Sequence, residues 1–167
     1  MVSAIKTDAA QEAEKLLDAA WPLRLTPVDP IAIARTAGLR VVDAPLPEET
    51  LGALIKTPGE EPTIMINEGI SEHRRRFTCA HELGHWVRRR ADEEEYSSVD
   101  LRSPLSSDGD DPEEIFANEF AASLLMPEEK FRNAHTLGRN DILLGIEFNV
   151  SREAAQFRLK NLGLTSS

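Results

Sequence analysis

Several kinds of residue are scarce in this chain of 167 residues, and each shortage excludes a class of protein. The single cysteine, Cys79, has no partner for an intramolecular disulfide, which excludes a disulfide-stapled fold and favours a reducing compartment. No apolar run approaches the roughly 20 residues that a membrane-spanning helix needs. Residues 1–20 also lack the basic-then-apolar order of a signal peptide. We therefore expect a cytoplasmic protein that does not associate with membranes.

Positive charge is scarce as well. The chain has 19 lysines and arginines against 29 aspartates and glutamates, a formal net charge of −10. A protein this acidic repels phosphate backbones unless its cations gather on one face, so direct nucleic-acid binding is not expected. A basic or hydrophobic protein partner is easier to accommodate. The content of 41% hydrophobic and 29% charged residues is typical of a globular domain.

The hydrophobic pattern predicts an α+β fold with helices before and after a small sheet. Asp29 and Pro30 indicate the start of one helix, and Asp111 and Pro112 indicate the start of another. Residues 91–111 are acidic and serine-rich, which predicts a long surface loop. The expected helices are 8–20, 30–37, 71–90 and 111–127, with two or three short ones from about residue 128. The expected strands are 39–44, 51–57 and 62–67, the last two paired as an antiparallel hairpin.

The stretch AHELGH, residues 80–85, contains two of the four histidines of the chain. Side chains four positions apart project from one face of a helix, so His81 and His85 can place imidazole nitrogens on one zinc ion. Glu82 lies about 100° round the helix, close enough to take a proton from a water that the metal activates, which is the chemistry of peptide-bond hydrolysis. The alternative is a helix with solvated or capping histidines. The metal site is favoured because the apolar side chains lie away from the histidines, at Cys79, Ala80, Leu83, Trp86 and Val87.

A zinc site in a hydrolase needs a third protein ligand and one open position. The longer motif HExxHxxGxxH would supply a third histidine, but positions 88 and 91 are arginine and alanine. A carboxylate from a later helix is the usual solution, and Glu114 is our first choice. Glu113 and Glu119 compete with it, and Glu114 could instead reach back to the backbone N–H of its own helix cap.

The helix face that carries Glu114 is otherwise formed by small residues. Ala117 and Ala121 follow Glu114 at helical spacing, so this helix can approach the histidine helix closely. Gly84, between the histidines, leaves space for a chain segment to approach. Asn118 lies one turn beyond Glu114 and could hydrogen-bond a metal ligand.

Two stretches, RRRFTCAHELGHW and EEIFANEFAASLLMP, resemble the hallmark motifs of the ImmA/IrrE-type metallopeptidases. The flanking stretches PVDPIAIARTAGLRVV and FNVSREAAQFRLKNLGL extend the resemblance over most of residues 25–164. Carried over residue by residue, it implies zinc ligands at His81, His85 and Glu114 and a catalytic carboxylate at Glu82. It also implies a compact zincin-like core in which the edge of the sheet, from 51–57 or 62–67, binds an extended substrate.

The resemblance further implies a cytoplasmic zinc endopeptidase of narrow specificity. Its implied substrate is a helix-turn-helix repressor of the XRE type, encoded by a neighbouring gene. One alternative is a zinc-containing binding module that sequesters a partner without cutting it, and another is a DNA-binding regulator that uses the C-terminal helices. Glu82 favours the peptidase over the binding module, because binding alone needs no base beside the metal.

The remaining candidates have simpler explanations. Cys79 is expected to be a buried small hydrophobe, and His73 and His135 to be surface or capping residues. Tyr96 could stabilise an oxyanion if its loop folded over the site. The arginines at 74–76 and 88–90 are expected to pair with the acidic loop or to stay solvated. Residues 128–167 resemble a helix-turn-helix extension, expected to pack on the core of a single domain, 1–167.

Overall fold

The computed structural model describes residues 1–90, 98–102 and 111–165, and for 98–102 it describes the backbone alone. These residues form an α+β fold, as predicted. Its helices are α1 (Val2–Ala20), α2 (Pro30–Thr36), α3 (Glu72–Arg89), α4 (Pro112–Leu125), α5 (Glu128–Thr136), α6 (Asp141–Phe148) and α7 (Arg152–Asn161). Its strands are β1 (Arg40–Ala44), β2 (Gly52–Lys56), β3 (Thr63–Asn67) and β4 (Ser98–Arg102).

The main helices begin where the sequence predicts. The Asp29 side chain accepts hydrogen bonds from the backbone of the first turn of α2, and Asp111 does the same for α4. Ser71 caps α3 by accepting a hydrogen bond from the backbone N–H of Arg74. Each cap satisfies a backbone donor that has no partner within its helix, so these short sequences determine where the helices start.

The sheet has the order β1-β3-β2-β4, in which β1 runs parallel to β3, and β2 runs antiparallel to both β3 and β4. The predicted hairpin of β2 and β3 is confirmed, with Ala53 opposite Met65. Two predictions are wrong. A fourth strand, β4, lies within the stretch 91–111 that we expected to be a loop. Because it covers the free side of β2, the edges of the sheet are β1 and β4, and the edge expected at 51–57 or 62–67 is internal.

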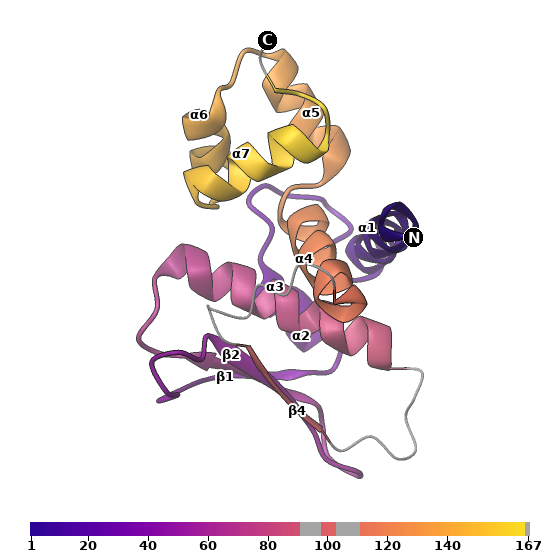
Figure 1. The fold of residues 1–167 in the computed structure, drawn as a ribbon, viewed down its shortest axis with the longest axis vertical. Coiled ribbons are helices and arrows are strands. Elements are labelled where there is room, and N and C mark those ends of the chain that lie inside the picture. The colour runs from indigo at the N-terminus through magenta and orange to yellow at the C-terminus, as the bar shows by residue number, and fades with distance from the viewer. Residues whose placement is uncertain (91–97, 103–110, 166–167) are drawn as a thin grey trace.

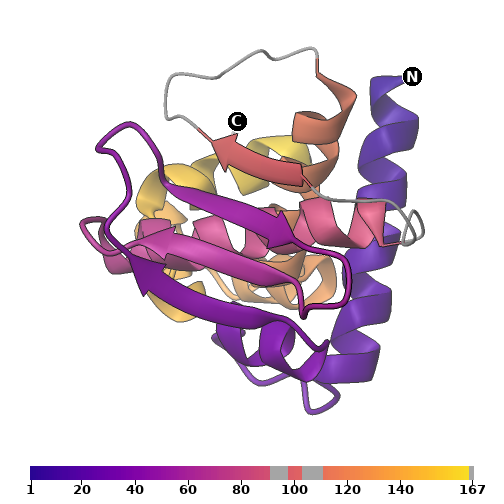
Figure 2. The same cartoon turned by 90° about the horizontal axis from the view of Figure 1, so that it is seen from below.

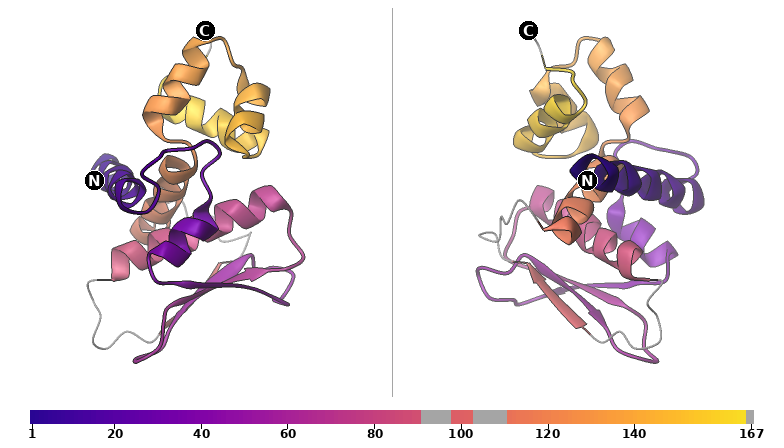
Figure 3. Two further views of the ribbon diagram at one scale, coloured as in Figure 1. Left: turned by 180° about the vertical axis from the view of Figure 1, so that it is seen from behind. Right: turned by 45° about the vertical axis from the view of Figure 1, so that its right-hand side comes forward.

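The molecule is layered. The sheet covers one side of α3, and α4 crosses the other side with α1 packed along it (Figures 1 and 2). The helices α5–α7 lie at the end of the molecule opposite the sheet (Figure 3). One hydrophobic core connects these layers, with Ile64 and Ile66 from the sheet, Leu83 from α3, Phe120 from α4 and Phe148 from α6. No described helix is both long and apolar enough to cross a membrane.

Two buried arginines connect the C-terminal helices to the rest of the chain. Arg76 of α3 donates hydrogen bonds to the backbone oxygens of Asn149 (2.9 Å) and Val28 (2.7 Å). Arg158 of α7 donates to the backbone oxygen of Met126 and pairs with Glu119 of α4, both at 3.1 Å. The helix-turn-helix-like part, α6 and α7, is therefore tied to the helices that carry the candidate site.

Candidate metal centre

The histidines of the AHELGH stretch lie on consecutive turns of α3, inside the protein. The side chain of His81 is 0% exposed and that of His85 is 4% exposed. Burial of both rings restricts their rotamers, so the direction of each imidazole is determined by the packing of α3 between the sheet and α4.

Gly84 lets α4 reach these histidines. A Cβ atom at Gly84 would lie 3.1 Å from the Cα of Ala117 and 3.1 Å from Cδ1 of Phe120, closer than about nine in ten real contacts of this kind. The predicted close approach is therefore present, and the segment that uses the space beside Gly84 is α4. The two small residues bring the helix axes together and place the first turn of α4 beside the histidines.

Glu114, in that first turn, completes a group of three donors. The Nε2 atom of His85 lies 3.0 Å from Nε2 of His81 and 3.1 Å from Oε1 of Glu114. The Nε2 atom of His81 lies 3.4 Å from Oε2 of Glu114. A tetrahedral zinc ion bonded at roughly 2.0–2.1 Å holds its ligand atoms about 3.3 Å apart. The pairwise distances are close to that value, with different oxygens of Glu114 facing the two histidines, and one donor atom from each residue lies within 4.8 Å of the others.

Asn118 determines which nitrogen of His81 is available. Its Oδ1 atom lies 3.0 Å from Nδ1 of His81. An amide oxygen only accepts hydrogen bonds, so Nδ1 carries a proton, and Nε2 is the nitrogen that can give its lone pair to a metal once its own proton has left. Asn118 thus makes the contact expected of a residue that supports a ligand.

The charge of Glu114 also fits a cation. Hydrogen bonding to His81, and then to His85, holds the pKa of Glu114 well below its ordinary value, although partial burial acts in the opposite direction. Glu114 is therefore a carboxylate at neutral pH. Two imidazole nitrogens and a carboxylate oxygen are donors that suit zinc, and the residues present fit such an ion.

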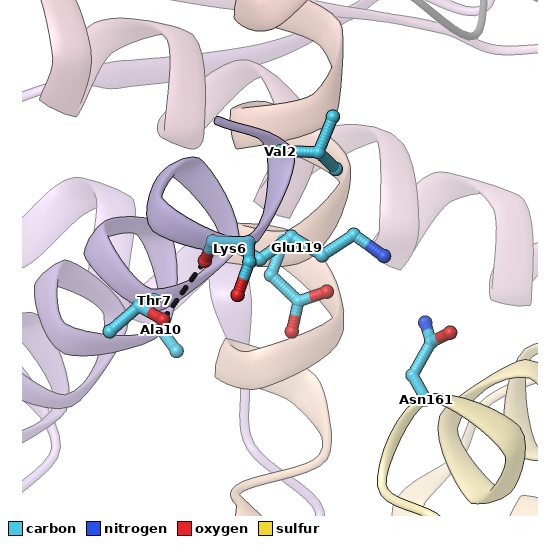
Figure 4. Close-up of a pocket in the computed structure, with 7 residues that line it drawn as sticks. Val2, Lys6, Thr7, Ala10, Glu119 and Asn161 are labelled. Carbon is cyan, nitrogen blue, oxygen red and sulfur yellow. Dashed lines mark hydrogen bonds between the residues drawn. The ribbon is translucent and has the colours of Figure 1, made fainter.

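The two competing glutamates of α4 are engaged elsewhere. Glu113 accepts a hydrogen bond from Arg88 at 2.6 Å. Glu119 pairs with Arg158 and accepts a hydrogen bond from Ser123. Glu119 also lines a cavity of about 440 Å³, together with residues of α1 and Asn161 of α7 and with no histidine (Figure 4). Of the three glutamates that the residues alone left open, Glu114 is therefore the one that lies beside His81 and His85.

Glu82 lies on the sheet side of α3. Its side chain is fully buried, and its Cγ atom would lie 3.7 Å from a Cβ placed on Gly52 of β2. Among the described residues, the group that could hold a metal contains His81, His85 and Glu114 and not Glu82. Glu82 therefore lies outside this group of donors, and its role as the base stays a prediction. The close contact of Gly52 with this helix was not predicted, because the sequence alone does not show how the strand 52–56 lies against α3.

The other candidates lie apart from the metal group. Cys79 is buried, and burial raises the pKa of its thiol to about 12, so it is an inert core residue. His73 is exposed, and His135 contacts the backbone oxygen of Arg139. Tyr96 and most of the acidic stretch lie outside the described residues.

Most of the arginines beside the metal helix have partners on other elements. Arg75 pairs with Asp43 of β1, and Arg90 pairs with Glu12 of α1 at 3.2 Å. Any further pair with residues 91–97 or 103–110 lies outside the described part of the chain.

A protein-family model matches most of the chain. Residues 34–160 match the model of a peptidase family, M78, described as the IrrE N-terminal-like domain. The match includes α3 and α4 and hence all the residues of the candidate site, whereas α1 precedes it. No curated protein matches the chain.

Proposed function

The chain belongs to the M78 peptidase family of IrrE N-terminal-like domains, and from this premise we propose that it is a zinc-dependent endopeptidase that cuts one regulatory protein. Membership of the family supports a function of the metallopeptidase type. The observation that carries the proposal is the convergence of the His81, His85 and Glu114 side chains, whose nearest donor atoms lie 3.0–3.4 Å apart, with Glu82 next to His81 in the sequence of α3.

Zinc is the proposed metal because of the donor set. Two histidines and one carboxylate leave a fourth position for water or substrate, as catalytic zinc sites require. Manganese or cobalt can occupy the same donors, so metal analysis decides between them. When bound, the ion supplies Lewis acidity that polarises the scissile carbonyl and acidifies the attacking water.

The residues of the chain perform the remaining tasks. Asn118 holds His81 in the tautomer that binds metal. Glu82 accepts a proton from the attacking water and delivers it to the leaving amine, the ordinary role of a general base and acid. Because Glu82 is fully buried, packing rather than solvent determines where its carboxylate lies.

An extended substrate needs a strand with free backbone groups. Within the described residues β4 pairs with β2 alone, so its outer side offers an edge to which a peptide segment can add as a further strand. We propose that the substrate binds at the edge formed by β4, because β2 and β3 are internal strands of the sheet.

The proposed substrate is a helix-turn-helix repressor of the XRE type, encoded beside this gene, and the reaction takes place in the cytoplasm. A DNA-binding repressor presents basic surface, which complements the net charge of −10 of this chain. Cleavage would separate the DNA-binding part of the repressor from the remainder and so relieve repression.

The test is cleavage of that repressor by purified, zinc-loaded protein. Wild type should cut it at one position, and Glu82→Gln should cut it about 10²–10⁴-fold more slowly with the same zinc content, because the base is lost. Glu113→Gln, a neutralised glutamate on the neighbouring helix, is the matched control and should retain activity. A Glu82→Gln protein that relieves repression as fully as wild type would support the binding module instead.

A further inference from the structure

Gly52, the first residue of β2, lies in close contact with the metal helix. A Cβ atom at this position would lie 2.5 Å from Cγ2 of Thr78 and 2.9 Å from the backbone oxygen of Met65. Optimal carbon–carbon contacts are about 3.5–4.0 Å, so an added methyl group would force β2 and α3 apart by roughly 1 Å. Its backbone conformation does not require glycine, since its φ is not in the left-handed range. The absence of a side chain is therefore a requirement of space.

The contact lies on the part of α3 that carries the proposed base. Thr78 and Glu82 are four residues apart on the same face of the helix, and the Cβ of a side chain at Gly52 would meet both, with Cγ of Glu82 at 3.7 Å. Thr78 is 1% exposed and Glu82 is 0% exposed, so neither side chain can move aside into solvent.

The same residue connects this contact to the edge of the sheet. Gly52 is opposite Ile66 of β3 on one side and Arg102 of β4 on the other. A change in the distance between β2 and α3 at Gly52 would therefore also shift the paired strand β4 relative to α3.

We propose that Gly52 is a positioning residue, which seats β2 on the methyl group of Thr78 and thereby fixes the Glu82 carboxylate relative to the metal ligands. This inference rests on the proposed function, since it assigns Gly52 a role through Glu82. The inference assigns different structural roles to two glycines. Gly84 brings the ligand Glu114 to the histidines, and Gly52 brings the sheet to the base.

The test measures binding of acetohydroxamate to the zinc-loaded protein, which requires no knowledge of the substrate. A hydroxamic acid loses its hydroxyl proton as its two oxygens bind a metal, and a carboxylate in place takes that proton, so its affinity reports the position of Glu82. Glu82→Gln calibrates the assay. Gly69→Ala is the matched control, because a Cβ at Gly69 would meet only Oδ1 of Asn67, at an ordinary 3.5 Å.

Gly52→Ala should bind zinc as tightly as wild type but bind acetohydroxamate about 10–100-fold more weakly, the range found when the support of a metal site is removed. Adding Thr78→Ser removes the methyl group at 2.5 Å but leaves the contact with the Met65 backbone oxygen at 2.9 Å, so it should restore part of the lost acetohydroxamate affinity. A role in stability alone would leave acetohydroxamate affinity unchanged in the folded variants. The single variant Thr78→Ser keeps Gly52 and introduces no steric clash. It therefore tests the contact between β2 and the Thr78 methyl group even if Gly52→Ala does not fold. This variant should bind acetohydroxamate several-fold more weakly than wild type, and its affinity for zinc should be unchanged.

Acetohydroxamate affinity equal to that of wild type in Gly52→Ala or in Thr78→Ser, with Glu82→Gln impaired, would overturn the inference alone. The inference would also be overturned if Gly52→Ala lost affinity for zinc and for acetohydroxamate in parallel and Thr78→Ser rescued neither. A Glu82→Gln protein that binds acetohydroxamate like wild type would instead refute the proposed role of Glu82, and with it the proposed function.

Discussion

Replacing Asn118 by alanine should weaken zinc binding without weakening the fold. The change removes the oxygen that lies 3.0 Å from Nδ1 of His81. Asn118 is exposed and lies on the surface of α4, so no core packing is lost. His81 is fully buried, so its Nδ1–H cannot turn to solvent for a replacement acceptor.

The expected loss follows from that geometry. A buried donor that loses an acceptor costs about 1–3 kcal/mol, and removal of a supporting hydrogen bond typically costs 10–100-fold in metal affinity. The two ranges agree, since a 10–100-fold loss is about 1.4–2.7 kcal/mol. Because the ring is then free to adopt the other tautomer, part of the loss reflects the proton that must leave Nε2 before a metal binds.

The assay is competition for zinc with a chromogenic chelator near neutral pH, with thermal unfolding of the metal-free protein measured in parallel. Asn118→Asp keeps an acceptor at this position and should bind zinc at least as tightly as wild type. Asn133→Ala, an exposed asparagine of α5, is the matched control. Wild-type affinity in Asn118→Ala would refute the reasoning, because it would show that His81 needs no acceptor at Nδ1.

Three further outcomes follow from packing and charge. Gly84→Ala places a methyl group 3.1 Å from Ala117 and should lower the free energy of unfolding in urea by about 1–3 kcal/mol while weakening zinc binding. Glu119→Gln leaves the 3% exposed Arg158 without its carboxylate and should destabilise the protein by about 3 kcal/mol in the same assay, with little change in zinc affinity. Cys79, whose thiol pKa is raised to about 12 by burial, should not react with a thiol reagent at pH 8 until urea unfolds the chain.

Each of these outcomes has a clear opposite. Wild-type stability in Gly84→Ala would mean that α4 is not held against α3 by close backbone contact. Unchanged stability in Glu119→Gln would mean that Arg158 is satisfied by the Met126 carbonyl alone. Rapid labelling of folded protein at Cys79 would mean that the core around α3 opens to solvent.

Features encoded over a few neighbouring residues could be predicted from the sequence. A helix start depends on a cap and the residues after it, so Asp29, Ser71 and Asp111 were sufficient to predict where α2, α3 and α4 begin. The pairing of His81 with His85 depends only on the helical repeat, and the structure places the two rings together.

Features that depend on packing between distant segments could not be predicted in the same way. Which glutamate of α4 faces the histidines depends on how that helix lies across α3, and from the residues alone Glu113 and Glu119 remained alternatives to Glu114. The strand β4 was missed because its residues are as polar as their neighbours and its pairing groups are supplied by β2. The edge of the sheet was misplaced for the same reason, and the contact at Gly52 required the structure.

Zinc content tests the central claim most directly. We predict that wild-type protein, purified and dialysed against trace zinc, retains one ion per chain, that Glu114→Ala loses it, and that Glu113→Gln keeps it. If Glu114→Ala retained a full equivalent of zinc with wild-type affinity, or if wild type retained none, a metal centre built from α3 and α4 would be contradicted.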